Sequence, residues 1–179
     1  VVDDAGLMDF GGYGGEVSTP YIKALGDAGV RFSNYHTSPL CAPTRAMLLT
    51  GVDNHLTGVG TIPEVVTPEQ KQTRGYSMQF LPEIETIADK LRTVWYRTYM
   101  TGKWHVTKHI SPDGPKNNWP MQRGFDRFYG TIHGAGSLWD PNTLTRNNTQ
   151  TSPENYEEYK PKKDWFYTDS ISDQTVRYI

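Results

Sequence analysis

The chain reads Cys41-Ala-Pro43-Thr-Arg45-Ala-Met-Leu-Leu-Thr-Gly51 in its first third, and this stretch indicates the fold more strongly than any other. Pro43 suits the first turn of a helix, because its missing N–H would have no helical partner there. Gly51 is a typical residue just after a helix C-terminus. The stretch therefore predicts a short helix that ends at Gly51, with Cys41 just ahead of its start.

The residues at the start of this helix favour binding of a tetrahedral anion. Backbone N–H groups and the helix dipole stabilise negative charge at a helix N-terminus. Arg45 lies one turn further on, and its guanidinium can form bidentate hydrogen bonds to an anion at this helix N-terminus. These features indicate a site for sulfate or phosphate, with Cys41 as the reactive side chain. The alternative is a buried structural thiol, which is the usual role of a lone cysteine.

Three motifs of this chain resemble those of the formylglycine-dependent sulfatases, the arylsulfatase family. The stretch 41–51 resembles the family signature, and Gly102-Lys103-Trp104-His105 resembles its Gly-Lys-Trp-His motif. The opening Val1-Val2-Asp3-Asp4 resembles its first strand, which ends in a metal-binding aspartate pair. The resemblance runs from residue 1 to about residue 146. It implies the N-terminal part of a catalytic domain of the alkaline-phosphatase-like superfamily.

The resemblance also implies a metal and a modified cysteine. Asp3, Asp4 and Cys41 would bind Ca²⁺, or alternatively Mg²⁺, since both ions prefer oxygen ligands. In the family, a formylglycine-generating enzyme oxidises the cysteine to an aldehyde, so that enzyme is expected as a maturation partner. The remaining metal ligands are expected after residue 179, which would leave the shell incomplete here. Without the other motifs, two adjacent aspartates would indicate only a solvated strand exit.

Lys103 and His105 are the candidates for charge stabilisation and proton transfer. They are two positions apart, so they project to the same side if the segment is extended. There they could bind an oxyanion and transfer a proton. The resemblance gives both of them, with Cys41 and Arg45, catalytic roles in sulfate ester hydrolysis through a covalent intermediate. His133 and Lys103 are the candidates for substrate binding. An ordinary solvated Lys-His pair is the alternative.

The alternation of expected helices and strands along the chain, together with the resemblance, predicts an α/β fold with a mixed, mostly parallel central sheet and helices on both faces. Ligands of such sheets collect at the carboxyl ends of strands. The region 110–168 is expected to be a loop-rich insertion on the substrate side, and its acidic and lysine-rich part, 154–163, a solvated face. The expected helices are 20–28 and 82–92, and the expected strands are 1–2, 30–35 and 97–100.

Composition limits the partners that the chain could have. Its net charge is −2 over 179 residues, so no global field attracts nucleic acid. No apolar run approaches the ~18 residues of a membrane span, so no membrane partner is expected. A single cysteine excludes an internal disulfide and leaves the compartment open, with export or a bacterial periplasm favoured over cytoplasm. A sulfate ester is the expected substrate.

The opening on Val1-Val2 reads as the middle of a strand, so the chain is expected to be the N-terminal portion of one catalytic domain, inactive by itself. Two other functions stay open beside sulfate ester hydrolysis. The first is a formylglycine-dependent hydrolase of phosphate or phosphonate esters, because these anions are tetrahedral too. The second is a catalytically incomplete fragment that only binds anions weakly.

Overall fold

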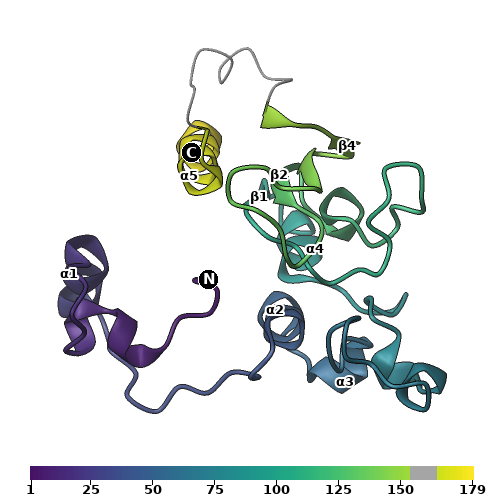
Figure 1. Ribbon diagram of the computed structural model, residues 1–179, viewed down its shortest axis with the longest axis horizontal. Coiled ribbons are helices and arrows are strands. Elements are labelled where there is room, and N and C mark those ends of the chain that lie inside the picture. The colour runs from purple at the N-terminus through teal and green to yellow at the C-terminus, as the bar shows by residue number, and fades with distance from the viewer. Residues whose placement is uncertain (154–164) are drawn as a thin grey trace. The chain divides into compact units, whose positions relative to one another are not determined.

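The structure is a computed structural model that describes residues 1–153 and 165–179 (Figure 1). The lysine-rich run expected at 154–163 to form a solvated face lies outside the described residues. The described residues divide into two compact units, residues 1–41 and residues 42–179. None of the described helices is both long and apolar enough to cross a membrane.

The first unit is built from short helices: η1 (Leu7–Asp9), η2 (Gly11–Tyr13) and α1 (Pro20–Ala28). The bounds of α1 agree with the prediction, because Pro20 occupies its first turn and Gly29 follows its last residue. The Thr19 hydroxyl does not cap the helix. Instead, Thr19 Oγ1 accepts a hydrogen bond from the Gly11 N–H at 3.0 Å, which ties the start of α1 to η2.

The prediction of two strands in the first unit is wrong. Val1–Val2 and the segment 30–35 are not strands in the structure, and Val1 and Val30 are each 77% exposed. A strand is stable only when a neighbouring strand pairs its backbone groups and a core covers its apolar face. The described part of the first unit gives these apolar segments neither, so their composition alone does not make them strands.

The second unit contains a mixed sheet, as predicted, but antiparallel pairs outnumber the parallel one among its described strands, where a mostly parallel sheet was expected. Its described strands are β1 (Tyr99–Thr101), β2 (Arg127–Thr131), β3 (Leu144–Arg146) and β4 (Thr149–Gln150), in the order β1-β2-β3-β4. The pair β1/β2 is parallel, whereas β2/β3 and β3/β4 are antiparallel. Only two residues join β3 to β4, a connection that antiparallel strands alone allow. The region 110–168, expected to be loop-rich, thus also contains three strands of the sheet.

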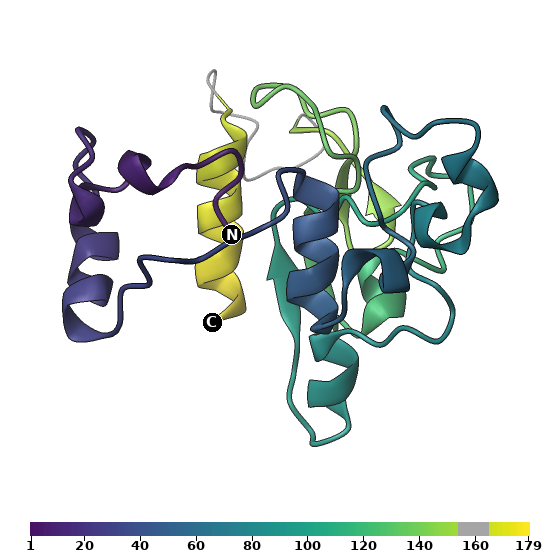
Figure 2. The same cartoon turned by 90° about the horizontal axis from the view of Figure 1, so that it is seen from below.

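Helices pack on both faces of this sheet, as predicted. On one face, Phe128 of β2 and the adjacent Ile132 pack with Ala46 of α2 (Cys41–Thr50) and with α4 (Ile87–Arg92). On the other face, Tyr129 packs with Tyr167 of α5 (Tyr167–Tyr178). Figure 2 shows β1 between α2 and α5. The alternation of side chains along β2 therefore separates two cores.

The helix predicted over 82–92 is shorter in the structure, because α4 begins only at Ile87. A capping box sets this start. The Asp89 N–H donates to Thr86 Oγ1 at 3.1 Å, and the Thr86 N–H donates to the Asp89 carboxylate at 2.9 Å. The remaining short helices of the second unit are α3 (Asn54–Thr57), η3 (Gln70–Gln72), η4 (Arg74–Tyr76) and η5 (Pro120–Arg123).

Candidate active site

Helix α2 places Arg45 at the end of β1. The helix ends at Thr50, and Gly51 follows with a φ of +69°, which confirms the predicted end, whereas the helix begins at Cys41 itself and not after it. Arg45 lies one turn after Cys41 and is 9% exposed. Its Nη1 donates a hydrogen bond of 2.5 Å to the carbonyl oxygen of Lys103. This bond joins α2 to the Gly-Lys-Trp-His segment, which follows β1.

The Gly-Lys-Trp-His segment, residues 102–105, runs alongside the end of β2. The Trp104 N–H donates to the carbonyl of Thr131 at 2.9 Å, and the His105 N–H donates to that of Ile132 at 3.1 Å. Trp104 is fully buried, and its indole N–H donates to the Asn118 carbonyl at 2.7 Å. Trp104 is thus the core anchor of the segment, so the residues on each side of it have fixed positions.

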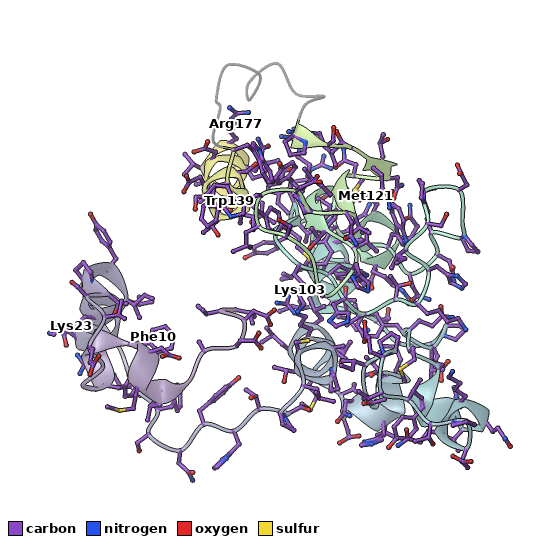
Figure 3. All side chains as sticks on the ribbon, viewed as in Figure 1. Phe10, Lys23, Lys103, Met121, Trp139 and Arg177 are labelled. Atoms are coloured by element: carbon purple, nitrogen blue, oxygen red, sulfur yellow. The ribbon has the colours of Figure 1, made fainter. Side chains whose placement is uncertain are left out.

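The segment bends at Gly102 and is not a regular extended strand. Gly102 has a φ of +97° and His105 a φ of +58°, both in the left-handed region. The condition under which Lys103 and His105 would project to one side, an extended segment, is therefore not met. The two side chains nevertheless interact, because the positive charge of Lys103 contributes to the lowered pKa of His105. Lys103 is half-buried and is labelled between α2 and the sheet in Figure 3.

His105 is neutral at physiological pH. Burial, with the nearby positive charges of Lys103, His133 and Arg45 and against an opposing effect of Glu64, lowers its pKa from 6.5 to about 4. A neutral imidazole is stabilised by burial because burial penalises the charged form. His105 can therefore accept a proton at any pH above about 4.

His133 lies next to His105, with 6.2 Å between the two ring centroids. A carboxylate oxygen of Glu64 lies 3.4 Å from Nε2 of His133, and the carbonyl oxygen of Ala135 lies 2.9 Å from its Nδ1. Its backbone N–H donates to Thr143 Oγ1 at 3.0 Å. The structure thus brings His133 into the site. Glu64 belongs to none of the motifs, and no pattern in the sequence pointed to it.

Gly134 leaves room for the His105 ring. A Cβ atom built on Gly134 would overlap Cε1, Nδ1 and Nε2 of that ring. Contacts this close do not occur between real side chains, so the absence of a side chain at position 134 is what lets His105 occupy its place. The loop after β2 therefore helps to position the imidazole.

The predicted metal ligands Asp3, Asp4 and Cys41 belong to the first unit. Asp3 and Asp4 are exposed, and Asp4 has a left-handed φ of +53°. Nowhere in residues 1–153 and 165–179 do three His, Cys, Asp or Glu side chains gather as a metal site. A hard cation such as Ca²⁺ takes six to eight oxygen ligands. The described residues thus do not build a metal site by themselves.

We expect His105 to make the fold sensitive to acid. Its pKa is about 4 in the folded state and near 6.5 in the unfolded state, so the unfolded state gains the proton first as pH falls. The neutral ring contributes stability that is complete above pH 6.5 and is lost as pH falls from 6.5 through about 4, up to about 3 kcal/mol.

This expectation is tested by the free energy of unfolding of the wild type and of His105→Gln at pH 7 and at about pH 4.5. The wild type should lose about 2 kcal/mol more than the variant between the two conditions. Equal losses would show that the folded state does not hold the ring neutral.

The family model for sulfatases matches residues 1–178 of this chain. An uncharacterized sulfatase of Schizosaccharomyces pombe is 36% identical over 151 residues, which are 83% of this chain and 26% of that protein. An arylsulfatase of Klebsiella aerogenes is 34% identical over 137 residues, 76% of this chain and 28% of that protein. Human arylsulfatase A is 38% identical over 131 residues, 72% of this chain and 23% of that protein. The chain thus spans about a quarter of the length of these relatives.

Solved structures share the fold. The crystal structure of Ps i-CgsB superposes with a TM-score of 0.74 at 24% identity and covers 98% of this chain and 39% of that one. A Bacteroides thetaiotaomicron protein from a genetic locus for glycosaminoglycan metabolism gives a TM-score of 0.62 at 28% identity, over 83% of this chain and 30% of that one. With the family model covering almost every residue, the chain belongs to the sulfatase family.

Proposed function

We propose that the protein hydrolyses sulfate esters, with a formylglycine made from Cys41 as its nucleophile. The observation that carries the proposal is the convergence of Arg45, Lys103 and His105. Arg45 Nη1 lies 2.5 Å from the Lys103 carbonyl, and the charges of both residues act on buried His105. Cys41 begins the helix that carries Arg45. Membership of the sulfatase family supports the same conclusion.

The residues of this chain would divide the reaction among them. The aldehyde formed from Cys41, once hydrated, supplies the oxygen that attacks sulfur. Arg45 and Lys103 stabilise the negative charge that builds on the sulfuryl oxygens while the bond from sulfur to the ester oxygen breaks. Because Arg45 is buried and held by the Lys103 carbonyl, its guanidinium needs little reorganisation during the reaction. After this attack, the second hydroxyl of the hydrated aldehyde must lose its proton before sulfate is released. His105, neutral above pH 4, accepts that proton.

Ca²⁺ at Asp3, Asp4 and the Cys41 derivative stays a prediction, as does maturation by a formylglycine-generating enzyme. Asp3 and Asp4 offer adjacent exposed carboxylates, which are the ligand type that Ca²⁺ prefers. The intact protein would have to supply further oxygen ligands, because the described residues gather no complete set. We assign no step of the reaction to the metal.

The choice between sulfate and phosphate esters is tested on the intact protein with paired chromogenic substrates. We expect kcat/KM for 4-nitrophenyl sulfate to exceed that for 4-nitrophenyl phosphate by about 10²-fold or more, because a site with few fixed cations binds a singly charged ester with less desolvation. The measurement is steady-state release of 4-nitrophenol at matched pH and Ca²⁺ concentration. A higher kcat/KM for the phosphate ester would assign the protein to phosphate chemistry instead.

A further inference from the structure

A pocket of about 700 Å³ opens in the second unit among residues 63–78 and Lys108. This volume is within the range of small-molecule sites in proteins. Three of its lining residues are cations, whereas no acidic side chain of the described chain lines it. The polar and apolar lining residues that matter for ligand binding are Thr73, Tyr76, Ser77 and Met78, and the cations are Lys71, Arg74 and Lys108.

Three lining residues of the pocket, Tyr76, Ser77 and Met78, are held in place by hydrogen bonds. The Met78 N–H donates to the carbonyl of Gly58 at 3.0 Å, and the Ser77 hydroxyl donates to the carbonyl of Gln79 at 2.8 Å. The Tyr76 hydroxyl lies 3.1 Å from Nε2 of His55. Because these bonds fix the three residues before a ligand arrives, binding does not have to order them.

The positive charge of the pocket comes from Lys71, Arg74 and Lys108. Arg74 forms an ion pair with Glu83, which lies outside the lining, so its charge is partly balanced. Lys71 and Lys108 are exposed and add two further charges on long side chains. Such cations attract an anionic group over roughly a Debye length, and salt screens this attraction.

The pocket adjoins the candidate active site through two segments. Glu64, whose carboxylate lies 3.4 Å from His133, is the neighbour in sequence of the lining residue Pro63. Lys108 lies three residues after His105, which an extended chain spans in about 10 Å. A ligand with two anionic groups separated by a short linker could therefore reach both places at once.

We propose that this pocket binds a second anionic group of a sulfated oligosaccharide whose reactive sulfate lies at Arg45, Lys103 and His105. The proposal deepens the sulfate ester function and rests on it for the reactive sulfate. Lys71 and Lys108 pair with the second sulfate, as ammonium groups do with oxyanions. The Tyr76 ring and Met78 offer an apolar surface to the sugar ring. A small aryl sulfate has no group that reaches the pocket.

The test compares two double variants of the intact protein that lose the same charge. Lys71→Gln with Lys108→Gln removes the pocket cations, and Lys90→Gln with Lys116→Gln removes two cations that do not line the pocket. Binding of fluorescently labelled low-mass dextran sulfate is measured at equilibrium, and KM is measured for 4-nitrophenyl sulfate. Melting temperatures check the fold, which changes at the exposed Lys71, Lys108 and Lys90 should barely affect, whereas Lys116 is half-buried and lies over the Trp119 ring at 5.1 Å.

The pocket variant should raise the Kd for dextran sulfate at least about tenfold, and the control variant by less than about threefold. KM for 4-nitrophenyl sulfate should stay within about twofold of wild type in both variants, since a lone sulfate reaches only the catalytic residues. An equal rise of Kd in both variants, or no rise in either, would contradict the proposal that the pocket binds a second anionic group. Failure of the wild type to hydrolyse 4-nitrophenyl sulfate would contradict the proposed function. The comparison of Kd values would still test whether the pocket binds an anionic group.

Discussion

Replacing Cys41 by alanine in the intact protein is expected to lower kcat for 4-nitrophenyl sulfate by at least about 10³-fold, because the proposed mechanism forms the nucleophilic oxygen on this side chain. Cys41→Ser should lose nearly as much activity. Serine has a single hydroxyl, so after attack on sulfur no second hydroxyl remains to give up a proton and expel sulfate. Steady-state assays of both variants measure the loss.

The control for this prediction is Leu48→Ala in the same helix. Leu48 is 53% exposed, and its truncation should leave kcat within about twofold of wild type. The melting temperature of Cys41→Ala should stay close to that of wild type, because Cys41 is only half-buried. If Cys41→Ala retained more than a few per cent of wild-type kcat, another group would have to be the nucleophile.

Gly134→Ala is expected to lower kcat by about 10²-fold, although position 134 carries no reactive group. A Cβ atom there would overlap the His105 ring, so the imidazole has to move. His105 cannot simply shift as a unit, because its backbone N–H is bonded to the Ile132 carbonyl at 3.1 Å. Displacing a catalytic group by about 1 Å can cost roughly that factor in rate.

Gly136→Ala in the same loop is the matched control. The nearest atom to a Cβ at Gly136 lies at 3.4 Å, an ordinary contact, so its kcat should remain near wild type. The pH profile separates displacement of His105 from general damage to the fold. Exposure of the ring in Gly134→Ala should move the acidic limb of kcat from about 4 up towards 6.5. A wild-type kcat and profile in Gly134→Ala would show that the loop does not position His105.

Local signals in the sequence were enough to predict α1 and α2. Pro20 and Pro43 in the first turns, with Gly29 and Gly51 after the ends, act on the backbone of their own segment. The start of α4 was equally local and was nevertheless missed. Thr86 and Asp89 form a Thr-x-x-Asp capping box, and that pattern would have placed the start at Ile87.

The strands depend on partners far along the chain, and this is why the sequence predicted them poorly. Strand β2 is buried on both faces between two cores, so its residues show no alternation of apolar and polar side chains. By contrast, Val30 and Phe32 look like strand residues but have no strand beside them in the described first unit. A strand exists only where a neighbour pairs with it.

Some residues of the candidate site could likewise be predicted from local sequence, whereas others depend on the fold. Arg45, Lys103 and His105 lie within two compact motifs, and the structure brings them together through the Arg45–Lys103 hydrogen bond of 2.5 Å. Glu64 enters the site only because the fold carries its segment next to His133. The sequence also could not show that His105 is buried, and this burial is the main cause of its low pKa.

The most direct test of the account is the mass of the tryptic peptide Phe32–Arg45 from the protein purified from its own organism. This peptide contains Cys41, the residue on which the proposed chemistry depends. Conversion of its thiol to formylglycine lowers the mass by about 18 Da, and we predict that this species predominates in active preparations. A fully active preparation whose peptide carried only the unmodified thiol would contradict the account.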